Sequence, residues 1–290
     1  MSLAVFANFR IDSHERLKRM KDSYYSFHKT KINQWIINIR GEYKNSAAKF
    51  LNQKLGKKLY LSTFETGNGW FFDSKIIAKK ISTEYVFIWI EDHICTCSKK
   101  KFNLILDEIK KNNIEYLQYS WFGRGLYLKE FKNIKKKQTK CLSFINYNIL
   151  AHKTRCKNVE QTLGIKPYII GLQGIFKIEF FFKILNSKRP ILRRWHKDTP
   201  FDFEKNGNDT YILPIKYGIP KFEIFSSIDD DNRYPGSSLI SRKEYPNRLT
   251  RLKMNEVRDR RLSNNKFKVI KKILFFSFLK NIIKRISYHF

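Results

Sequence analysis

The chain has 290 residues, 42% of them hydrophobic and 16% aromatic, and it carries a formal net charge of +32 at pH 7. The apolar content is sufficient for a buried core and excludes a disordered chain, in spite of the charge. A charge of this size is typical of proteins that bind nucleic acid, an anionic membrane surface or phosphorylated small molecules, although the many Lys, Asn and Ile residues are also what an AT-rich coding bias produces.

The cysteine pattern and the hydropathy argue against two further classes. Cys95 and Cys97 form a C-x-C pair, but neither Cys141 nor Cys156 completes the spacing of a zinc finger or zinc ribbon. No stretch approaches the roughly 18 uninterrupted apolar residues of a membrane-spanning helix. The start of the sequence has no signal-peptide pattern, and we therefore expect reduced cysteines and a cytoplasmic protein.

The first 95 residues alternate apolar runs with helical patterns. Residues 14–29 carry apolar side chains at helical spacing from Leu17 to Phe27, and Ser13 precedes them as a helix cap. The expected order is strand 3–9, helix 14–29, strand 32–39, helix 45–56, strand 57–64, helix 74–82 and strand 84–90. Strands that alternate with helices form βαβ units, so the sequence predicts an α/β fold with a mostly parallel sheet flanked by helices.

A polar cluster lies at the C-terminal end of each of the four expected strands. The clusters are Asn8-Phe9-Arg10, Asn38-Ile39-Arg40-Gly41, Glu65 to Trp70, and Glu91-Asp92-His93. In open parallel sheets, ligands bind beyond the carboxyl ends of the strands. We therefore expect the four clusters to converge on one edge of the sheet and to form a binding site there.

The last cluster, Glu91-Asp92-His93, ends the most hydrophobic strand of a very basic chain. Two adjacent carboxylates are unfavourable there unless a positive group binds them. Mg²⁺ or Mn²⁺ takes carboxylate oxygens together with substrate phosphates, and His93 is a candidate third ligand or phosphate contact. The alternative is that Glu91 and Asp92 cap a helix or pair with lysines.

This order of elements resembles the N-terminal half of GT-A fold glycosyltransferases of the family-2-like group. The resemblance is carried by "FANFR" in the first strand, "GNGW" in the loop before the third helix and "YVFIWIEDH" at the fourth strand. It implies a GT-A-like fold and a nucleotide-sugar donor. It also makes Asp92, with Glu91, the counterpart of the family's acidic motif, which binds Mg²⁺ or Mn²⁺.

The same resemblance assigns contacts with the donor. The candidate donor-binding residues are Asn8, Arg10, Asn38, Arg40, Gly67, Asn68, Gly69 and Glu91. The sequence departs from the family after the second strand, where "NIRG" replaces an acidic pair. Arg40 cannot accept hydrogen bonds from a base as a carboxylate would, but it could clamp a phosphate or a carboxylated sugar.

The second half of the chain offers a catalytic base. Inverting members of the group need a carboxylate to deprotonate the acceptor hydroxyl. "WHKDTPFDFE" supplies Asp198, Asp202 and Glu204 beside aromatic residues, and its "P-F-x-F-E" resembles an acceptor-site segment of capsule and lipopolysaccharide sugar transferases. We expect Glu204 to be the base, with Asp198 as the second candidate.

Composition suggests a domain boundary near residue 231. Residues 1–231 are expected to form the transferase domain, with the nucleotide-sugar half at 1–95 and the acceptor half at 96–231. Asp229-Asp230-Asp231 precedes a Pro-Gly pair and is interpreted as a solvated turn, with a metal site as the alternative. The basic, phenylalanine-rich segment 232–290 is typical of a helix on an anionic membrane surface, and a terminal helix packed on the domain is the alternative.

Three hypotheses follow. The first is a metal-dependent glycosyltransferase, peripheral on the inner face of the cell membrane, that moves a sugar to a surface glycan or lipid-linked acceptor. The second is a nucleic-acid-binding protein, which the charge favours and the lack of any recognition motif argues against. The third is a membrane-surface scaffold with an inactive nucleotide fold.

Overall fold

The computed structural model describes residues 1–120, 127–163, 166–187, 199–229 and 237–246. It divides the chain into two compact units, Met1–Tyr245 and Pro246–Phe290. The helices, strands and contacts reported below all belong to the first unit. Asp198, Asp230 and most of the basic C-terminal segment lie outside the described residues, so the predictions made for them stay predictions.

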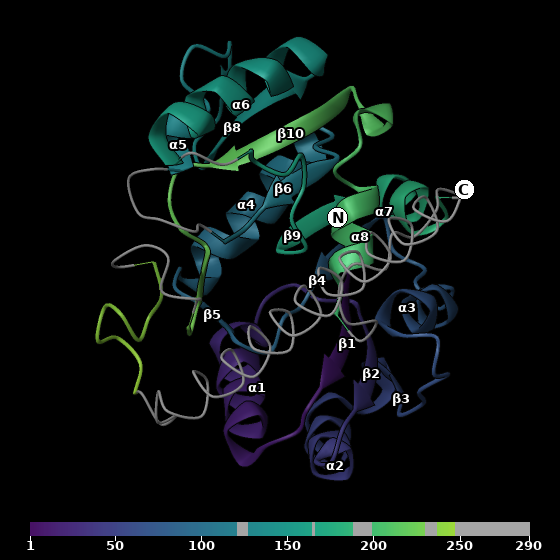
Figure 1. Cartoon of the computed structure of the whole chain (residues 1–290). Coiled ribbons are helices and arrows are strands. Elements are labelled where there is room, and N and C mark those ends of the chain that lie inside the picture. The colour runs from purple at the N-terminus through teal and green to yellow at the C-terminus, as the bar shows by residue number, and fades with distance from the viewer. Residues whose placement is uncertain (121–126, 164–165, 188–198, 230–236, 247–290) are drawn as a thin grey trace, which may run out of the picture. The chain divides into compact units, whose positions relative to one another are not determined.

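A nine-stranded sheet forms the centre of this unit, in the order β3-β2-β1-β4-β9-β6-β10-β8-β7 (Figure 1). Its strands are β1 (Leu3–Arg10), β2 (Gln34–Arg40), β3 (Leu59–Ser62), β4 (Tyr85–Ile88), β6 (Tyr116–Gln118), β7 (Lys137–Gln138), β8 (Leu142–Tyr147), β9 (Gly174–Lys177) and β10 (Ile215–Pro220). Strands β8 and β9 run opposite to the other strands of this sheet. The predicted α/β fold with a mostly parallel sheet is confirmed.

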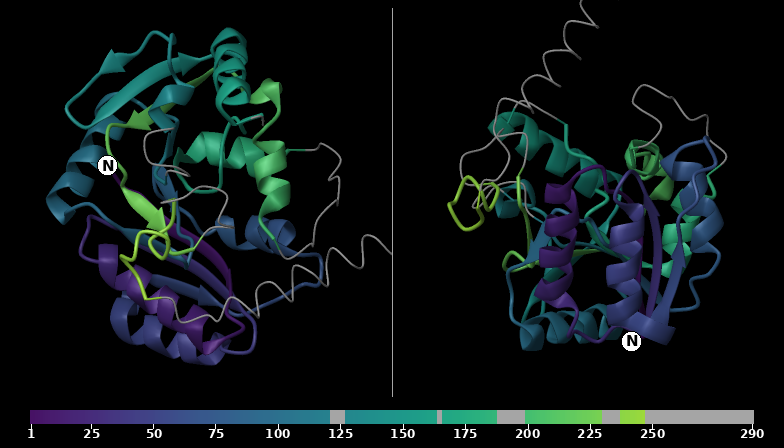
Figure 2. Two further views of the ribbon diagram at one scale, coloured as in Figure 1. Left: turned by 60° about the vertical axis from the view of Figure 1, so that its left-hand side comes forward. Right: turned by 90° about the horizontal axis from the view of Figure 1, so that it is seen from below.

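Helices cover both faces of the sheet (Figures 1 and 2). They are α1 (His14–Phe27), α2 (Lys44–Leu55), α3 (Trp70–Ala78), α4 (Lys99–Lys111), α5 (Tyr127–Glu130), α6 (Ile149–Leu163), α7 (Ile178–Leu185) and α8 (Phe201–Asn206), with short 3₁₀ turns at Gly56–Lys58 and Thr210–Ile212. One apolar cluster joins the sheet to α1, α2 and α4, and a second joins it to α3, α7 and α8. Strand β1 belongs to both clusters, with Val5 in the first and Phe6 in the second, as expected for a strand buried on two faces.

Helix α1 begins where the sequence places its cap. The Ser13 hydroxyl accepts a hydrogen bond from the Arg16 amide at 3.1 Å. The apolar side of the helix, from Leu17 to Phe27, is buried in the core. Because α1 directly follows β1, its first turn lies beside the carboxyl end of that strand, where Arg16 donates to the Arg10 carbonyl at 2.9 Å.

The predicted strand 84–90 is longer than the observed one. Strand β4 ends at Ile88, and the chain turns at Glu91 and Asp92 into a separate strand, β5 (His93–Cys95). Strand β5 pairs with β11 (Phe225–Ser227) in a second, two-stranded sheet. Trp89 is buried although it lies beyond β4, because its ring packs against Phe9 and its Nε1 donates to Ser23 Oγ.

The first unit extends past residue 231. The Leu239 amide donates to the Ser227 carbonyl at 2.9 Å, and Arg242 pairs with Glu223 at 2.8 Å. The Tyr245 hydroxyl donates to Asp22 of α1 at 2.5 Å. Residues 237–245, which the sequence analysis assigned to the C-terminal extension, therefore pack on this unit. Among the described residues, none of the helices has the length and apolar character needed to cross a membrane.

Gly41 directly follows β2 and has a backbone conformation that favours glycine. Its replacement tests this turn. Its φ is +93°, and a Cβ there would lie 2.4 Å from Asp12 Oδ1 and 2.7 Å from the Ile11 carbonyl. Gly56 also has a positive φ, +50°, but no atom lies within 4 Å of its Cβ position. We expect Gly41→Ala to lower the free energy of unfolding by about 3 kcal/mol, and Gly56→Ala by about 1 kcal/mol.

Urea unfolding followed by circular dichroism measures both losses of stability. Equal losses for the two variants would show that the protein accommodates a Cβ at position 41, next to Asp12 and Ile11, without additional loss of stability.

Candidate functional site

The parallel strands bring the predicted residues to one edge of the sheet. In the pairing of β1 with β2, Asn8 lies beside Asn38 and Arg10 beside Arg40. Strand β4 pairs with β1 on the other side in the same direction, so the turn at Glu91 and Asp92 follows at the same edge. The strand ends therefore form one continuous polar edge, which we call the strand-end site.

Asn8 and Asn38 are buried at the floor of this site and hold its loops. Asn8 Oδ1 accepts from Asn38 Nδ2 and from Arg40 Nε, both at 3.1 Å. Asn8 Nδ2 donates to the Trp70 carbonyl at 3.2 Å, while Asn38 Nδ2 donates to the Phe64 carbonyl at 3.0 Å. These hydrogen bonds fix the start of α3 and the loop after β3. That either amide contacts a nucleotide-sugar donor directly stays a prediction.

Two arginines share one carboxylate at the edge. Arg10 pairs with Glu65, and Arg40 Nη1 lies 3.8 Å from the same Oε1 of Glu65. The Arg40 side chain is buried, with 1% of its surface exposed, whereas that of Arg10 is 31% exposed. Arg10 is therefore the one of the pair that can reach a ligand. Arg40 contacts Asn8 and Glu65 inside the protein and so holds the strand ends in place.

The loop from Glu65 to Trp70 is open at its tip. Gly67 and Gly69 have φ values of +77° and +99°, and Asn68 is exposed. No atom lies within 4 Å of the Cβ position of Gly67, so a ligand can approach the backbone there. The base of the loop is held by Asp73, whose Oδ1 accepts from the Thr66 amide and hydroxyl.

Glu91 and Asp92 lie side by side in a turn but have opposite pKa shifts. Burial, followed by the charge of Asp92, raises the pKa of Glu91 to about 7. Burial alone would also raise the pKa of Asp92, but the hydrogen bond and charge of His93, with more distant Arg19 and Arg16, lower it below the usual value. Glu91 also lies 3.6 Å from Arg16 Nη1. The pair therefore combines one carboxylate that stays charged with one that takes up a proton near neutral pH.

His93 supports Asp92. Its Nδ1 lies 2.8 Å from Asp92 Oδ1, its carbonyl accepts from Ser23 Oγ, and its ring meets Tyr119 edge to face at 6.1 Å. His93 Nε2 is buried and has no hydrogen-bond partner in the described part of the chain. His93 Nδ1 therefore orients Asp92, and the metal role of His93 stays a prediction.

A buried ion-pair group lies behind the acidic turn. Arg19 of α1 donates to Glu15 at 3.1 Å and to Asp229 at 2.6 Å, and its side chain is 5% exposed. The Ile228 amide donates to the Asp92 carbonyl at 2.7 Å. Asp229, interpreted from the sequence as part of a solvated turn, is therefore tied to α1 directly behind the acidic turn.

Glu204 lies at the same edge of the sheet. Its Oε1 accepts a hydrogen bond from the Leu172 amide at 2.9 Å. Leu172 precedes β9, which pairs antiparallel with β4, so Leu172 lies beyond the carboxyl end of β4. Burial raises the pKa of Glu204, although the Leu172 hydrogen bond partly opposes this. A carboxylate with a raised pKa suits a general base, and Asp198 lies outside the described residues.

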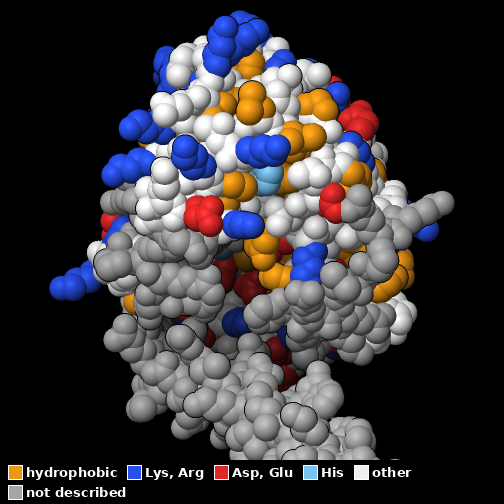
Figure 3. All heavy atoms as spheres, turned by 45° about the horizontal axis from the view of Figure 1, so that its top comes forward, with side chains coloured by type: hydrophobic (Ala, Val, Ile, Leu, Met, Phe, Trp, Pro, Cys, Tyr) orange, Lys and Arg blue, Asp and Glu red, His pale blue; other side chains and the backbone are white. Residues whose placement is uncertain are grey.

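Figure 3 shows acidic and basic side chains close together on one face of the molecule. Such a mixture is what alternating ion pairs, like those of the strand-end site, produce. Within the described ranges, no group of three or more His, Cys, Asp or Glu residues is arranged to hold a metal ion. A cation bound at Asp92 and Glu91 would therefore need ligands from its substrate or from water.

No family model and no curated protein matches this sequence. Among solved structures, the chain is similar to S. aureus TarS 1-349 in complex with UDP-GlcNAc (TM-score 0.52, 13% identity, 80% of this chain and 60% of that chain) and in complex with UDP (TM-score 0.50, 13% identity, 78% and 60%). It also matches S. aureus TarS over 78% of this chain and 36% of that chain, with a TM-score of 0.50 and 13% identity. The chain thus spans about three fifths of the TarS 1-349 chain. This likeness fits the GT-A-like fold expected from the sequence.

Sequence reasoning missed several residues of the site. Arg16 and Arg19 lie three residues apart just after the cap of the first helix. This spacing puts both on the same side of a helix that follows the first strand, and it was a weak signal of a site there. Glu65 was recognised only as the start of a polar loop. Nothing in the sequence pairs Asp229 with Arg19, because 210 positions separate them.

The opposite pKa shifts of Glu91 and Asp92 predict opposite effects of neutral variants. The folded protein releases the Glu91 proton near pH 7 and the unfolded chain near pH 4.5, so the charge of Glu91 destabilises the fold as the pH rises between these values. We expect Glu91→Gln to raise the free energy of unfolding at pH 8 by up to about 3 kcal/mol, with little effect at pH 4.5.

Asp92→Asn serves as the matched control, because the lowered pKa of Asp92 means that its charge stabilises the fold above the unfolded pKa. It should lower the unfolding temperature at pH 8. Thermal unfolding at both pH values, with EDTA present, measures the two effects. Destabilisation by both variants at pH 8 would show that Glu91 is held as a favourable anion by Arg16.

Proposed function

We propose that this chain is a glycosyltransferase that takes a sugar from a nucleotide-sugar donor. The observation that carries the proposal is a strand-end site of arginines and carboxylates within a fold shared with TarS, a glycosyltransferase whose structures hold UDP-GlcNAc and UDP. The site lies at the carboxyl ends of parallel strands, where open α/β sheets bind nucleotides.

Arg10 and Arg16 are the proposed phosphate contacts. Both guanidinium groups are partly exposed at the edge, at 31% and 51% of their side-chain surface, and guanidinium groups bind phosphate oxygens in pairs. The open backbone at Gly67 and Asn68 allows close approach of the donor. Because the TarS structures hold UDP and UDP-GlcNAc, UDP-sugars are the first donors to test.

Asp92 and Glu91 are the residues that would hold Mg²⁺ or Mn²⁺. Two adjacent carboxylates at the edge suit a cation that shares its coordination with donor phosphates. When bound, the ion offsets the negative charge that develops on the leaving nucleotide diphosphate. His93 holds the Asp92 carboxylate in place through Nδ1.

Glu204 is the proposed general base. It would accept the proton of the acceptor hydroxyl at Oε2, since Oε1 is engaged by the Leu172 amide. Its raised pKa brings its proton affinity closer to that required at neutral pH. Asp198 remains the second candidate.

The acceptor and the cellular setting rest on the sequence alone. The resemblance of "P-F-x-F-E" to capsule and lipopolysaccharide transferases supports a surface glycan or lipid-linked acceptor. The basic segment 232–290 supports a peripheral position on the inner face of the cell membrane.

Donor binding is tested by thermal unfolding of the purified chain with UDP-, GDP-, CMP- and dTDP-sugars, with and without Mn²⁺. A ligand that binds only the folded state raises the unfolding temperature. We expect a UDP-sugar with Mn²⁺ to raise it, and Asp92→Asn to remove most of that rise, each variant being compared with its own ligand-free value. Asp107→Asn, on the exposed side of α4, is the control and should keep the full shift. A folded Asp92→Asn protein with the full metal-dependent shift would exclude Asp92 as the metal ligand.

The base is tested by Glu204→Gln. We expect kcat for sugar transfer to fall at least about 100-fold, with the KM for the donor changed less than about threefold, because the amide keeps the acceptor of the Leu172 bond but cannot take a proton. Glu179→Gln, an exposed change on α7, is the control. Unchanged kcat in Glu204→Gln would assign Glu204 a structural role and move the base to Asp198.

A further inference from the structure

A cavity of about 580 Å³ lies beside β7 and β8, the last two strands in the sheet order. It is also lined by the start of β10 and the first turns of α6. Glu115 precedes β6, and Pro214 precedes β10, so this lining belongs to the amino ends of those strands. Strands β6 and β10 run in the same direction as β4. The cavity is therefore at the end of the sheet opposite to the strand-end site, and it is not part of the proposed donor site.

The cavity is strongly basic. Four lysines line it, Lys135, Lys136, Lys137 and Lys216, against one carboxylate, Glu115. Glu115 Oε2 already accepts a hydrogen bond from the Lys216 amide at 2.7 Å. Within the described residues, neither Lys135 nor Lys137 has an ion-pair partner.

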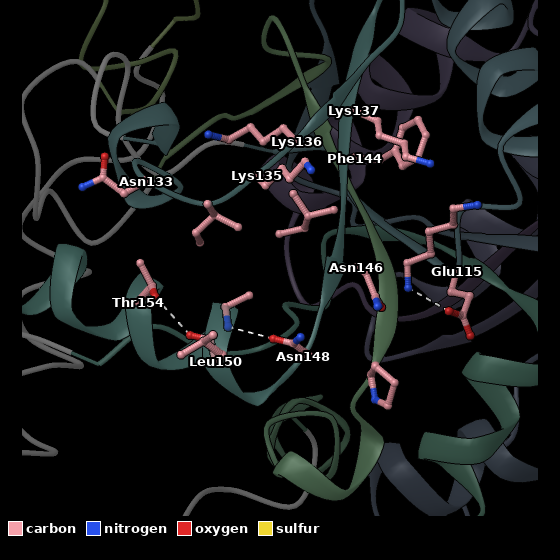
Figure 4. A pocket seen from close by; sticks show the side chains of 15 residues that line it. Glu115, Asn133, Lys135, Lys136, Lys137, Phe144, Asn146, Asn148, Leu150 and Thr154 are labelled. Carbon is pink, nitrogen blue, oxygen red and sulfur yellow. Dashed lines mark hydrogen bonds between the residues drawn. The ribbon is translucent and has the colours of Figure 1, made fainter.

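The opposite wall of the cavity contains the start of helix α6. In Figure 4, Lys135, Lys136 and Lys137 lie on one side, and Asn148, Leu150 and Thr154 lie on the other. Asn148 precedes α6, its Oδ1 caps the Ala151 amide at 2.9 Å, and the first turn of this 15-residue helix contains no acidic residue. A helix start without acidic residues leaves its positive end uncompensated.

The lining is also apolar to a degree that a phosphate ion alone does not require. Ile134, Phe144, Ile145 and Pro214 are part of it. Leu150 at the rim is 73% exposed, and its neighbour Ile149 is 53% exposed. The Lys136 ammonium group donates to the Phe131 carbonyl, and burial lowers its pKa. A ligand with one anionic group and an aliphatic part would satisfy both features.

We propose that this cavity binds the phosphate headgroup of an anionic membrane lipid, with the phosphate between the lysines and the start of α6 and the glycerol and first acyl carbons against Leu150. The site would give the described unit its own contact with a membrane, independent of the basic C-terminal segment. The proposal does not rest on the proposed transferase activity.

The test uses the full-length chain and a lipid that forms no bilayer, so that the C-terminal segment has no membrane to bind. Dihexanoyl phosphatidic acid, kept below its micelle concentration, is titrated by calorimetry beside inorganic phosphate and dihexanoyl phosphatidylcholine. We expect phosphatidic acid to bind at least about tenfold more tightly than either of the others, because only it offers an uncompensated phosphate and an apolar part.

Paired variants identify the cavity as the place of binding. Lys135→Gln with Lys137→Gln should weaken phosphatidic acid binding roughly tenfold or more, from the loss of two cations. The matched control is Lys57→Gln with Lys58→Gln, two exposed lysines outside the cavity lining, and it should change the affinity less than about twofold. Leu150→Ser should weaken binding of phosphatidic acid but leave binding of inorganic phosphate unchanged.

Other outcomes would overturn the proposal. Equal affinity for inorganic phosphate and phosphatidic acid, lost together in the Lys135 and Lys137 variant, would show a site for free phosphate. Equal weakening by the two lysine pairs would show binding through general charge. No heat of binding with a folded chain would show that the cavity takes no lipid phosphate.

Discussion

The parallel pairing of β1 with β2 places two arginines, Arg10 and Arg40, side by side at one edge of the sheet. Two neighbouring guanidinium groups repel each other unless an anion lies between them. Glu65 supplies that anion from the loop after β3, and Asn8 accepts a further hydrogen bond from Arg40. The register of the two central strands therefore determines where the loop and the start of α3 lie. The other features of the strand-end site are arranged around that fixed loop.

The acidic turn at Glu91 and Asp92 depends on contacts over long distances in the sequence. Arg16 and Arg19 face it from α1, and the pairing of β5 with β11 brings Asp229 behind it. Adjacent buried carboxylates cannot both be charged without support from cations. His93 and the arginines favour the charge on Asp92, while Glu91 has the raised pKa. A strongly basic chain therefore keeps two carboxylates here because His93, followed by Arg19 and Arg16, favours the charge on Asp92.

The sequence predicted the order of strands and helices in the first half, because each strand is an apolar run and most helices have a cap or periodicity, but α3 begins at Trp70 and not at residue 74. Pairing between distant segments could not be predicted in this way. Strand β9 is inserted between β4 and β6, and β5 joins β11 in a second sheet. Gly218 lies inside β10, where a Cβ would come within 2.8 Å of Leu117. The glycine allows close packing there, and a sequence does not distinguish this use from a turn.

The basic residues are arginines at the strand-end site and lysines at the cavity. The charge of the donor site can therefore be considered apart from the charge of the lysines. At the strand-end site the cations are arginines, and Arg10, Arg16 and Arg19 each already contact a carboxylate. A nucleotide phosphate would have to exchange with these carboxylates, so the net attraction at long range is small and geometry decides the affinity. At the cavity the cations are lysines, of which Lys135 and Lys137 have no ion-pair partner among the described residues. Compact ammonium groups without partners attract any anionic surface and are sensitive to salt. The lysines of the cavity therefore contribute to the excess positive charge of the chain without bearing on the nucleotide that the arginines would select.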